Sequence, residues 1–159
     1  LASLNINPDY RSALEKKGLV CTDTLLRTDP ERCLECATVC ECCADVCPNR
    51  ANLAIQVPGM RMRQIIHVEG LCNECGNCAT FCPYDSAPYR EKFTLFGSAQ
   101  ELAGSQNDGF LLLDAAAQRY RVRLDGREAD YLVEDPACGL PEGIRALILA
   151  VSRSYAYLL

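Results

Sequence analysis

The sequence lacks the short motifs that usually mark a catalytic site. It contains a single histidine, His67, and its serines and histidine form no recognisable nucleophile motif. Its ten glycines never occur as Gly-x-Gly, so neither a dinucleotide fingerprint nor a phosphate-binding loop is predicted. The acidic residues carry no spacing typical of paired catalytic carboxylates. The sequence therefore predicts no catalytic site within this chain.

Long apolar runs are also absent. No stretch of about 18 apolar residues occurs, which is the length at which a transmembrane helix is expected. The first residues lack the basic and apolar segments of a secretory signal. A net charge of −5 without a basic stripe argues against a nucleic-acid partner. We expect a cytoplasmic protein without a membrane span and, since residue 1 is not methionine, a module of a longer polypeptide or complex.

Cysteine, in contrast, is abundant. Twelve cysteines occur among 159 residues, and ten of them lie between positions 33 and 82. A disulfide scaffold would need an oxidising compartment, and no export signal is present. Closely bunched thiols in a reducing compartment are typical of metal sites. The cysteine-rich segment therefore predicts metal binding.

Residues 72–83 read Cys-Asn-Glu-Cys-Gly-Asn-Cys-Ala-Thr-Phe-Cys-Pro, which is the bacterial iron–sulfur pattern C-x2-C-x2-C-x3-C-P. In this pattern three thiolates bind one cluster, and the fourth, followed by proline, binds a second cluster. The short gaps let backbone N–H groups point at the sulfurs, and Gly76 permits a positive φ there. Zinc is the alternative, but a zinc ribbon needs two C-x2-C pairs about 15–20 residues apart. We therefore predict one [4Fe–4S] cluster here and a partner run elsewhere.

The partner run lies upstream, at residues 33–48, with altered spacing. Its end, Cys43-x3-Cys47-Pro, repeats the end of the downstream run. Three cysteines compete for its two opening positions. Cys33 and Cys36 keep a C-x2-C turn and place an insertion afterwards, which is the assignment we favour. Cys36 and Cys40 are the alternative.

Two [4Fe–4S] clusters with crossed ligation follow from the favoured assignment. The first would be bound by Cys33, Cys36, Cys43 and Cys82, and the second by Cys72, Cys75, Cys78 and Cys47. Because each loop then binds both clusters, neither half is expected to fold without metal. Cys42 is predicted to be a spare small hydrophobe, and Cys21 and Cys138 to be ordinary buried cysteines. We expect His67 to be a half-exposed strand residue rather than a proton acceptor for a cluster.

The predicted fold class is α+β, in three segments. Residues 1–32 form a helical lead-in, residues 33–90 a two-cluster ferredoxin-like domain, and residues 91–159 a small β-meander with a C-terminal helix that docks a partner. The expected helices are 8–17, 22–32 and 142–158, with one helical turn inside the loop 98–108. The expected strands are 53–57 and 63–68, which form a hairpin, and then 92–96, 110–113, 119–124 and 129–133. Strand 119–124 alternates apolar and polar residues, so one of its faces should be solvated.

Two stretches of the sequence carry resemblances to known families. Glu31-Arg-Cys-Leu-Glu-Cys36 resembles the opening of the iron–sulfur modules in the glutamate synthase small subunit and dihydropyrimidine dehydrogenase, which supports Cys33 and Cys36 as ligands. From Arg32 onward, Cys43-Ala-Asp-Val-Cys-Pro-Asn-Arg-Ala-Asn52 and Cys72-Asn-Glu-Cys-Gly-Asn-Cys78 are similar to the C-terminal region of the selenate reductase iron–sulfur flavoprotein subunits. In that family this region follows an NAD(P)H- and flavin-binding portion.

The second resemblance implies a function. A ferredoxin-like module of this kind would relay electrons between a flavin- and NAD(P)H-dependent component and an oxidoreductase partner, such as a molybdenum hydroxylase. The alternative is an iron–sulfur module that scaffolds a larger complex and lies off the electron path.

Overall fold

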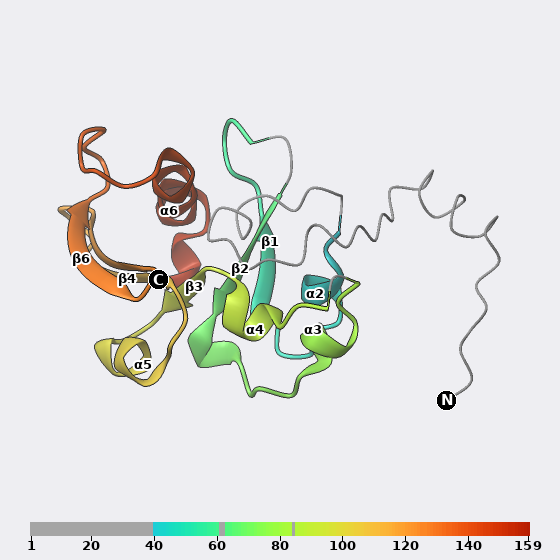
Figure 1. Cartoon of the computed structure of the whole chain (residues 1–159). Helices are drawn as coiled ribbons and strands as arrows, with labels where there is room; N and C mark the ends of the chain where they lie inside the picture. Colours follow the sequence, from blue (N-terminus) through green and yellow to red (C-terminus); the bar gives the residue numbers. More distant parts are fainter. Residues whose placement is uncertain (1–39, 61–62, 84) are drawn as a thin grey trace, which may run out of the picture.

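The computed structural model describes residues 40–60, 63–83 and 85–159 (Figure 1). The predicted helices 8–17 and 22–32, together with Cys21, Cys33 and Cys36, lie outside these residues. Within them the fold is α+β, as predicted, with one mixed sheet of six strands and a C-terminal helix.

The six strands follow chain order across the sheet, from β1 to β6. Their bounds are β1 Asn52–Ile55, β2 Gln64–Val68, β3 Thr94–Phe96, β4 Gly109–Asp114, β5 Arg119–Leu124 and β6 Arg127–Leu132. Strands β1 and β2 form the predicted antiparallel hairpin, and β4, β5 and β6 form the predicted meander. The three-residue strand β3 pairs in parallel with β2 on one side and with β4 on the other. The hairpin and the meander therefore belong to one sheet, and the division into segments at residue 90 stays a prediction.

Short helices surround this sheet, and one longer helix completes it. Their bounds are α2 Cys42–Asp45, η3 Glu69–Leu71, α3 Asn77–Thr80, α4 Pro88–Glu91, α5 Ala99–Gly104, α6 Glu142–Ser154 and η4 Ala156–Leu158. Helix α6 ends four residues before the predicted end because Tyr155 leaves the helical backbone, with φ of −130°. The Tyr155 hydroxyl accepts a hydrogen bond from the Gln56 N–H at 2.9 Å, which ties this end of the chain to the residue after β1. Among the described residues, no helix is long and apolar enough to cross a membrane.

The sheet has two faces with different coverings (Figure 1). We call the side covered by α6 the helix face; its apolar core includes Ile66, Phe110, Leu147 and Ile148. The opposite side, the loop face, is covered by α2, α3 and α5, which enclose two smaller clusters: Cys43, Ala44, Ile65 and Cys78, and Phe96, Leu102 and Leu111. Because side chains alternate along a strand, neighbouring residues of β2 belong to opposite faces.

The parallel pairing of β3 and β4 brings two backbones close together at Gly109. A Cβ built at Gly109 would lie 2.1 Å from the Thr94 carbonyl oxygen, so only glycine fits this position. The strand residues next to it contribute to the core, where the rings of Phe93 and Phe110 stack at 5.5 Å between centroids. The centre of the sheet is therefore tightly packed.

Candidate metal centre

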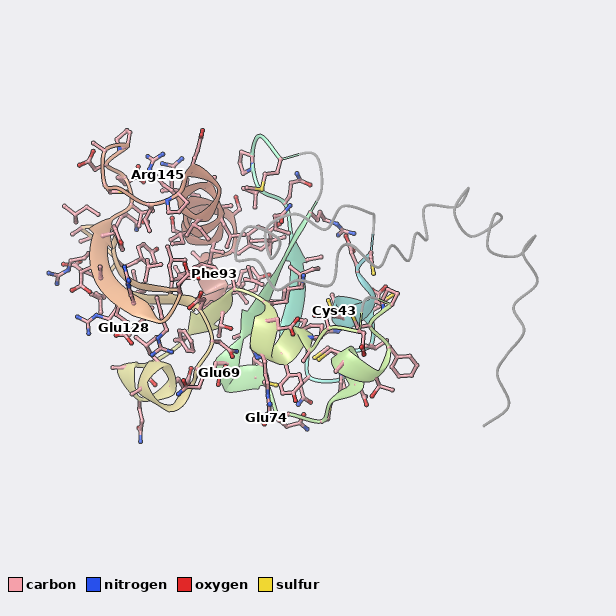
Figure 2. The ribbon with its side chains drawn as sticks, in the orientation of Figure 1. Cys43, Glu69, Glu74, Phe93, Glu128 and Arg145 are labelled. Carbon is pink, nitrogen blue, oxygen red and sulfur yellow. The ribbon has the colours of Figure 1, made fainter. Side chains whose placement is uncertain are left out.

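The two cysteine runs fold into similar loops that pack together. Helix α2 carries Cys43 and leads to Cys47, while α3 carries Cys78 and leads to Cys82. Cys43 and Cys78 are each 7% exposed and lie in one apolar cluster with Ile65. Figure 1 shows α2 and α3 side by side next to the β1–β2 hairpin, and Figure 2 shows Cys43 at this end of the molecule.

The backbone after each Cys-Pro pair repeats as well. The N–H of Arg50 donates to the carbonyl of Cys47, and the N–H of Asp85 donates to the carbonyl of Cys82. Arg50 has φ of 57° and Asp85 has φ of 53°, a left-handed conformation that non-glycine residues rarely adopt. A residue with positive φ, whose N–H donates to the carbonyl of the last cysteine, thus occurs three residues after that cysteine in both runs. Such conformations persist where surrounding structure or function requires them.

Cys47 of the upstream run lies in the electrostatic environment of the downstream run. Burial raises the pKa of the Cys72 thiol, and the Glu74 N–H lowers it. The neighbouring charges of Cys78, Glu69 and Cys47 raise it further. Cys78 and Cys47 therefore both act on the Cys72 thiol, while Cys75 of the same predicted set is exposed, and the crossed ligation stays a prediction.

Two backbone N–H groups point at sulfur atoms in these loops. The Glu74 N–H donates to Cys72 Sγ at 3.3 Å, and the Ala51 N–H donates to Cys47 Sγ at 3.2 Å. Hydrogen bonds of this kind stabilise a thiolate and tune a cluster bound to it. Gly76 has the predicted positive φ, 77°, immediately before α3. In the described part of the chain, a Cβ at Gly76 would meet no atom within 4 Å, so glycine is needed there for its backbone freedom rather than for space.

Cys40 and Cys42 lie near the other predicted ligand set. Burial raises the pKa of the Cys40 thiol, and the side chains of Cys42 and Cys82 also raise it. Cys40 therefore lies close to Cys82, the predicted ligand of the first cluster. Cys33 and Cys36 lie outside the described residues, so both assignments of the opening pair stay predictions. Cys138, predicted to be buried, is partly exposed, because it lies in the connection before α6.

In residues 40–60, 63–83 and 85–159, no three side chains of His, Cys, Asp or Glu converge as ligands of a single metal ion. A [4Fe–4S] cluster makes a different geometric demand. Each of its four irons takes one thiolate, so the four sulfurs lie around a cube rather than around one atom. The donor set here, thiolates with N–H···S hydrogen bonds, matches the ligands that such clusters take.

The sequence-based prediction for His67 is wrong. The side chain is 1% exposed rather than half-exposed, because β2 pairs on both edges and is covered on both faces. Its Nδ1 lies 2.9 Å from Asn52 Oδ1, and Asn52 Nδ2 donates to the carbonyl of Cys43 at 3.2 Å. Since Asn52 Oδ1 is then the acceptor, Nδ1 carries the hydrogen and Nε2 keeps a lone pair. Burial lowers the pKa of His67 to about 4, so the ring is neutral at pH 7.

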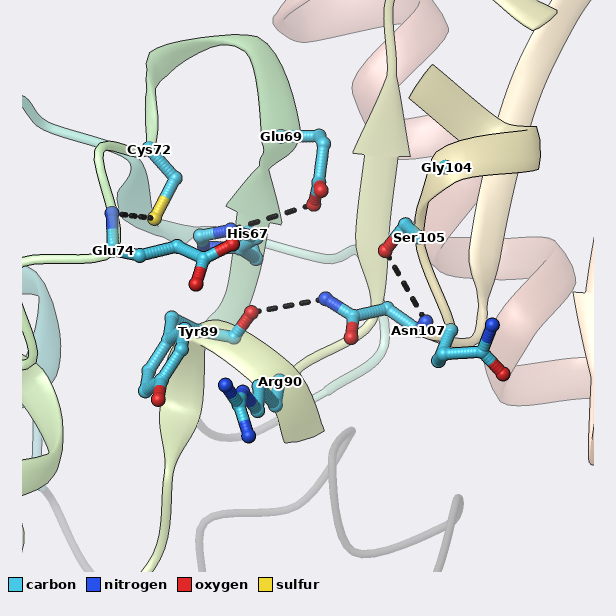
Figure 3. Close-up of a pocket in the computed structure, with 10 residues that line it drawn as sticks. His67, Glu69, Cys72, Glu74, Tyr89, Arg90, Gly104, Ser105 and Asn107 are labelled. Atoms are coloured by element: carbon cyan, nitrogen blue, oxygen red, sulfur yellow. Dashed lines mark hydrogen bonds and ion pairs between the residues drawn. The ribbon is translucent and has the colours of Figure 1, made fainter. Parts of the chain in front are cut away.

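His67 forms part of the wall of a pocket on the loop face (Figure 3). The pocket has a volume of about 360 Å³. Three segments surround it: η3 together with the start of the downstream cysteine run, helix α4, and the connection from α5 to β4. Its lining residues are His67, Glu69, Cys72, Glu74, Tyr89, Arg90, Gly104, Ser105, Gln106 and Asn107. A polar pocket therefore adjoins Cys72, a predicted ligand of the second cluster. The sequence singled out Cys72 and His67 but did not predict the pocket.

Comparison with known proteins gives two related sequences. Both are named "Putative oxidoreductase YgfK", one from Escherichia coli strain K12 and one from Escherichia coli O157:H7. Each is 50% identical to this chain over 106 residues, which is 66% of the chain and 10% of the relative. No protein-family model and no solved structure matches. The chain is therefore homologous to a region of an oxidoreductase of this name, and it spans about a tenth of the length of the curated relatives it matches.

Proposed function

We propose that this chain transfers electrons through two [4Fe–4S] clusters. The observation that carries the proposal is the packing of the two cysteine runs against each other: Cys43 of α2 and Cys78 of α3 share one buried cluster, and Cys47 is among the charges that raise the pKa of the Cys72 thiol. Unrelated thiols give no reason for the two runs to pack together, whereas the two-cluster pattern needs them close enough to share ligands. The repeated turns after Cys47 and Cys82 support the same interpretation, since they make the two loops equivalent.

The proposed ligands divide into two sets. The first cluster takes Cys33, Cys36, Cys43 and Cys82, and the second takes Cys72, Cys75, Cys78 and Cys47. Cys40 is the alternative to Cys33, and its position near Cys82 keeps that choice open to experiment. When bound, the clusters accept and release single electrons. The protein contributes N–H groups directed at Cys72 and Cys47 and an apolar cluster that shields Cys43 and Cys78 from water.

The proposed partners are other parts of a redox complex. The homology to about a tenth of a larger oxidoreductase supports a role as one region or subunit of such a complex. Together with the family resemblance, it favours a relay from a flavin- and NAD(P)H-dependent component to an oxidoreductase, such as a molybdenum hydroxylase.

Metal analysis of anaerobically purified protein tests this proposal. We expect about eight iron and eight sulfide per chain, and a paramagnetic reduced state after dithionite, as two [4Fe–4S] clusters require. About four iron per chain, or zinc alone, would refute it. Reduction of the assembled complex by NAD(P)H, followed as bleaching of the cluster absorbance, separates electron transfer from a scaffolding role. Clusters that stay oxidised in that assay would be structural.

A further inference from the structure

The pocket on the loop face contains two hydrogen-bond acceptors that face each other. His67 Nδ1 donates to Asn52, so His67 Nε2 presents a lone pair. Within the described residues Nε2 makes no hydrogen bond, and its nearest polar partner is Glu69 Oε2 at 3.8 Å (Figure 3). The His67 side chain is 1% exposed, and Nε2 does not belong to the buried side-chain atoms that lack a partner in the described residues, so it is accessible from the pocket. Glu69 also interacts through a hydrogen bond with the Ser105 side chain, so a donor group in the pocket would be a further partner for these two acceptors.

The charges around the pocket favour a positively charged donor. Glu69 and Glu74 both line it, and Figure 3 shows both side chains around the His67 ring. The Glu101 carboxylate is also near, since its Oε1 lies 3.2 Å from where a Cβ of Gly70 would be. Arg90 is the one basic residue among the lining residues, and its guanidinium lies over the Tyr89 ring, 5.0 Å from the ring centre. The lining thus carries two carboxylates and one guanidinium, with a third carboxylate near Gly70.

The walls of the pocket are held by buried hydrogen bonds. Asn107 Nδ2 donates to the carbonyl of Tyr89 at 2.9 Å and to Thr94 Oγ1 at 3.1 Å, which joins the segment after α5 to helix α4. The Arg123 guanidinium donates to the carbonyls of Ser105 at 2.7 Å and Asn107 at 3.2 Å. Arg123 is 7% exposed and Asn107 8% exposed. The pocket is therefore preformed, as binding sites for small groups usually are.

We infer that this pocket binds a ligand with a guanidinium or alkylammonium group, accepted by His67 Nε2 and the carboxylates of Glu69 and Glu74. The volume, about 360 Å³, suits a head group of this size. The group belongs either to a small free cation or to a lysine or arginine side chain of a docked polypeptide.

A cation in this position would also act on the second cluster. Cys72 is a lining residue and a proposed cluster ligand, so the bound charge would lie next to the cluster. A nearby positive charge stabilises the more negative, reduced state and raises the reduction potential. This consequence rests on the proposed function, whereas the binding itself does not.

Isothermal titration calorimetry of the full chain with methylguanidinium chloride tests the binding. Methylurea is the neutral counterpart of similar shape, and potassium chloride controls for ionic strength. We expect saturable heat with methylguanidinium only, and at least about tenfold weaker binding in Glu69→Gln, which loses a charged acceptor. Glu74→Gln provides a second variant in the same pocket, on an exposed residue. Glu142→Gln removes the same charge from the start of α6 and should bind as the wild type does.

The binding results distinguish a polypeptide side chain from a small free cation, and they test the inference itself. Binding of an acetylated, amidated Gly-Arg-Gly peptide at least about tenfold tighter than methylguanidinium would indicate a polypeptide side chain, and equal or weaker binding would indicate a small free cation. Methylguanidinium heat no different from that of the controls, or equal affinity in Glu69→Gln and Glu74→Gln, would overturn the inference.

A redox titration of the same samples tests the effect on the cluster. We expect saturating methylguanidinium, but not methylurea, to raise the midpoint potential of the second cluster in the wild type and to have less effect in Glu69→Gln. Binding without a change of potential would overturn the coupling to the cluster. Absence of iron from the protein would refute the proposed electron transfer while the calorimetric result still decides whether the pocket binds a cation.

Discussion

The two faces of the sheet are stabilised in different ways. On the helix face, α6 buries a continuous apolar core that includes Leu147, Ile148 and Val151. On the loop face, the four-residue helices α2 and α3 share a cluster of only four fully buried residues, two of which are Cys43 and Cys78. Helices of one turn have little stability of their own in water.

This difference indicates where the stability of each face comes from. A large apolar core stabilises the helix face through burial, at about 1.5–3 kcal/mol for each large aliphatic side chain. Around α2 and α3 there is too little apolar surface for this, so we expect metal binding to supply the missing stability. The comparison predicts that substitutions on the two faces have separable effects.

The largest effect should come from Cys78→Ser. This change removes a proposed ligand of the second cluster and places a hydroxyl in the buried contact between α2 and α3. We expect loss of the second cluster, and with it at least half of the iron, together with unfolding of the loop face, because each loop supplies ligands to both proposed clusters. Hydrogen exchange should show lost protection in β1 and β2 while α6 stays protected. The matched control is Cys138→Ser, which should retain all the iron; loss of iron in this control as well would contradict the assignment.

Cys40→Ser and Cys33→Ser, compared as a pair, sharpen the ligand assignment on the loop face. If Cys33 binds the first cluster, Cys33→Ser should lose about half the iron and Cys40→Ser should keep it. Iron analysis and the spectrum of the reduced protein measure the difference. The opposite result would assign the position to Cys40, in agreement with its place near Cys82.

On the helix face, Leu147→Ala should destabilise the fold without removing iron directly. Leu147 is fully buried in the α6 core, and truncation of such a residue costs about 2–5 kcal/mol. Denaturant unfolding followed by circular dichroism measures the loss in the free energy of unfolding. Iron content in the absence of denaturant should equal that of the wild type; a loss of iron as large as in Cys78→Ser would show that the two faces are not separable.

The smallest effect should be a pH dependence of the stability, caused by His67 on the loop face. The pKa of His67 is about 4 when folded and about 6.5 when unfolded, so the unfolded state binds more protons between these values. Stability from this group is complete above pH 6.5 and falls as pH drops toward 4, by about 1.4 kcal/mol per pH unit at most. The variant His67→Asn keeps a donor toward Asn52 and removes the titrating ring. The difference in unfolding free energy between wild type and variant should change across this range; a constant difference would contradict the depressed pKa.

Local signals in the sequence predicted much of the architecture correctly. The hairpin β1–β2 and the meander follow from alternation and turn residues, and the turn at Asp125 and Gly126 has the positive φ at both positions, 50° and 73°, that favours Asp-Gly. These features depend on a few neighbouring residues, so a local pattern suffices to predict them.

Other features depended on contacts far apart in the chain. Alternation predicted a solvated face for β5, but Arg123 on that face is buried because its guanidinium binds the carbonyls of Leu102, Ser105 and Asn107. His67 was predicted to be half-exposed because the sequence does not show that β3 covers the second edge of β2. No sequence pattern marked the pocket, whose walls come from separate segments.

The sequence by itself determined that this is an α+β chain with two cysteine-rich loops, and it predicts that their spacing suits iron–sulfur ligation, because cysteine spacing and hydrophobic period are local properties. Only the tertiary structure decided that one sheet joins the hairpin to the meander, that His67 is buried and neutral, and that a polar pocket adjoins Cys72. The physical reason is that the exposure and charge state of a side chain depend on which distant segments pack against it.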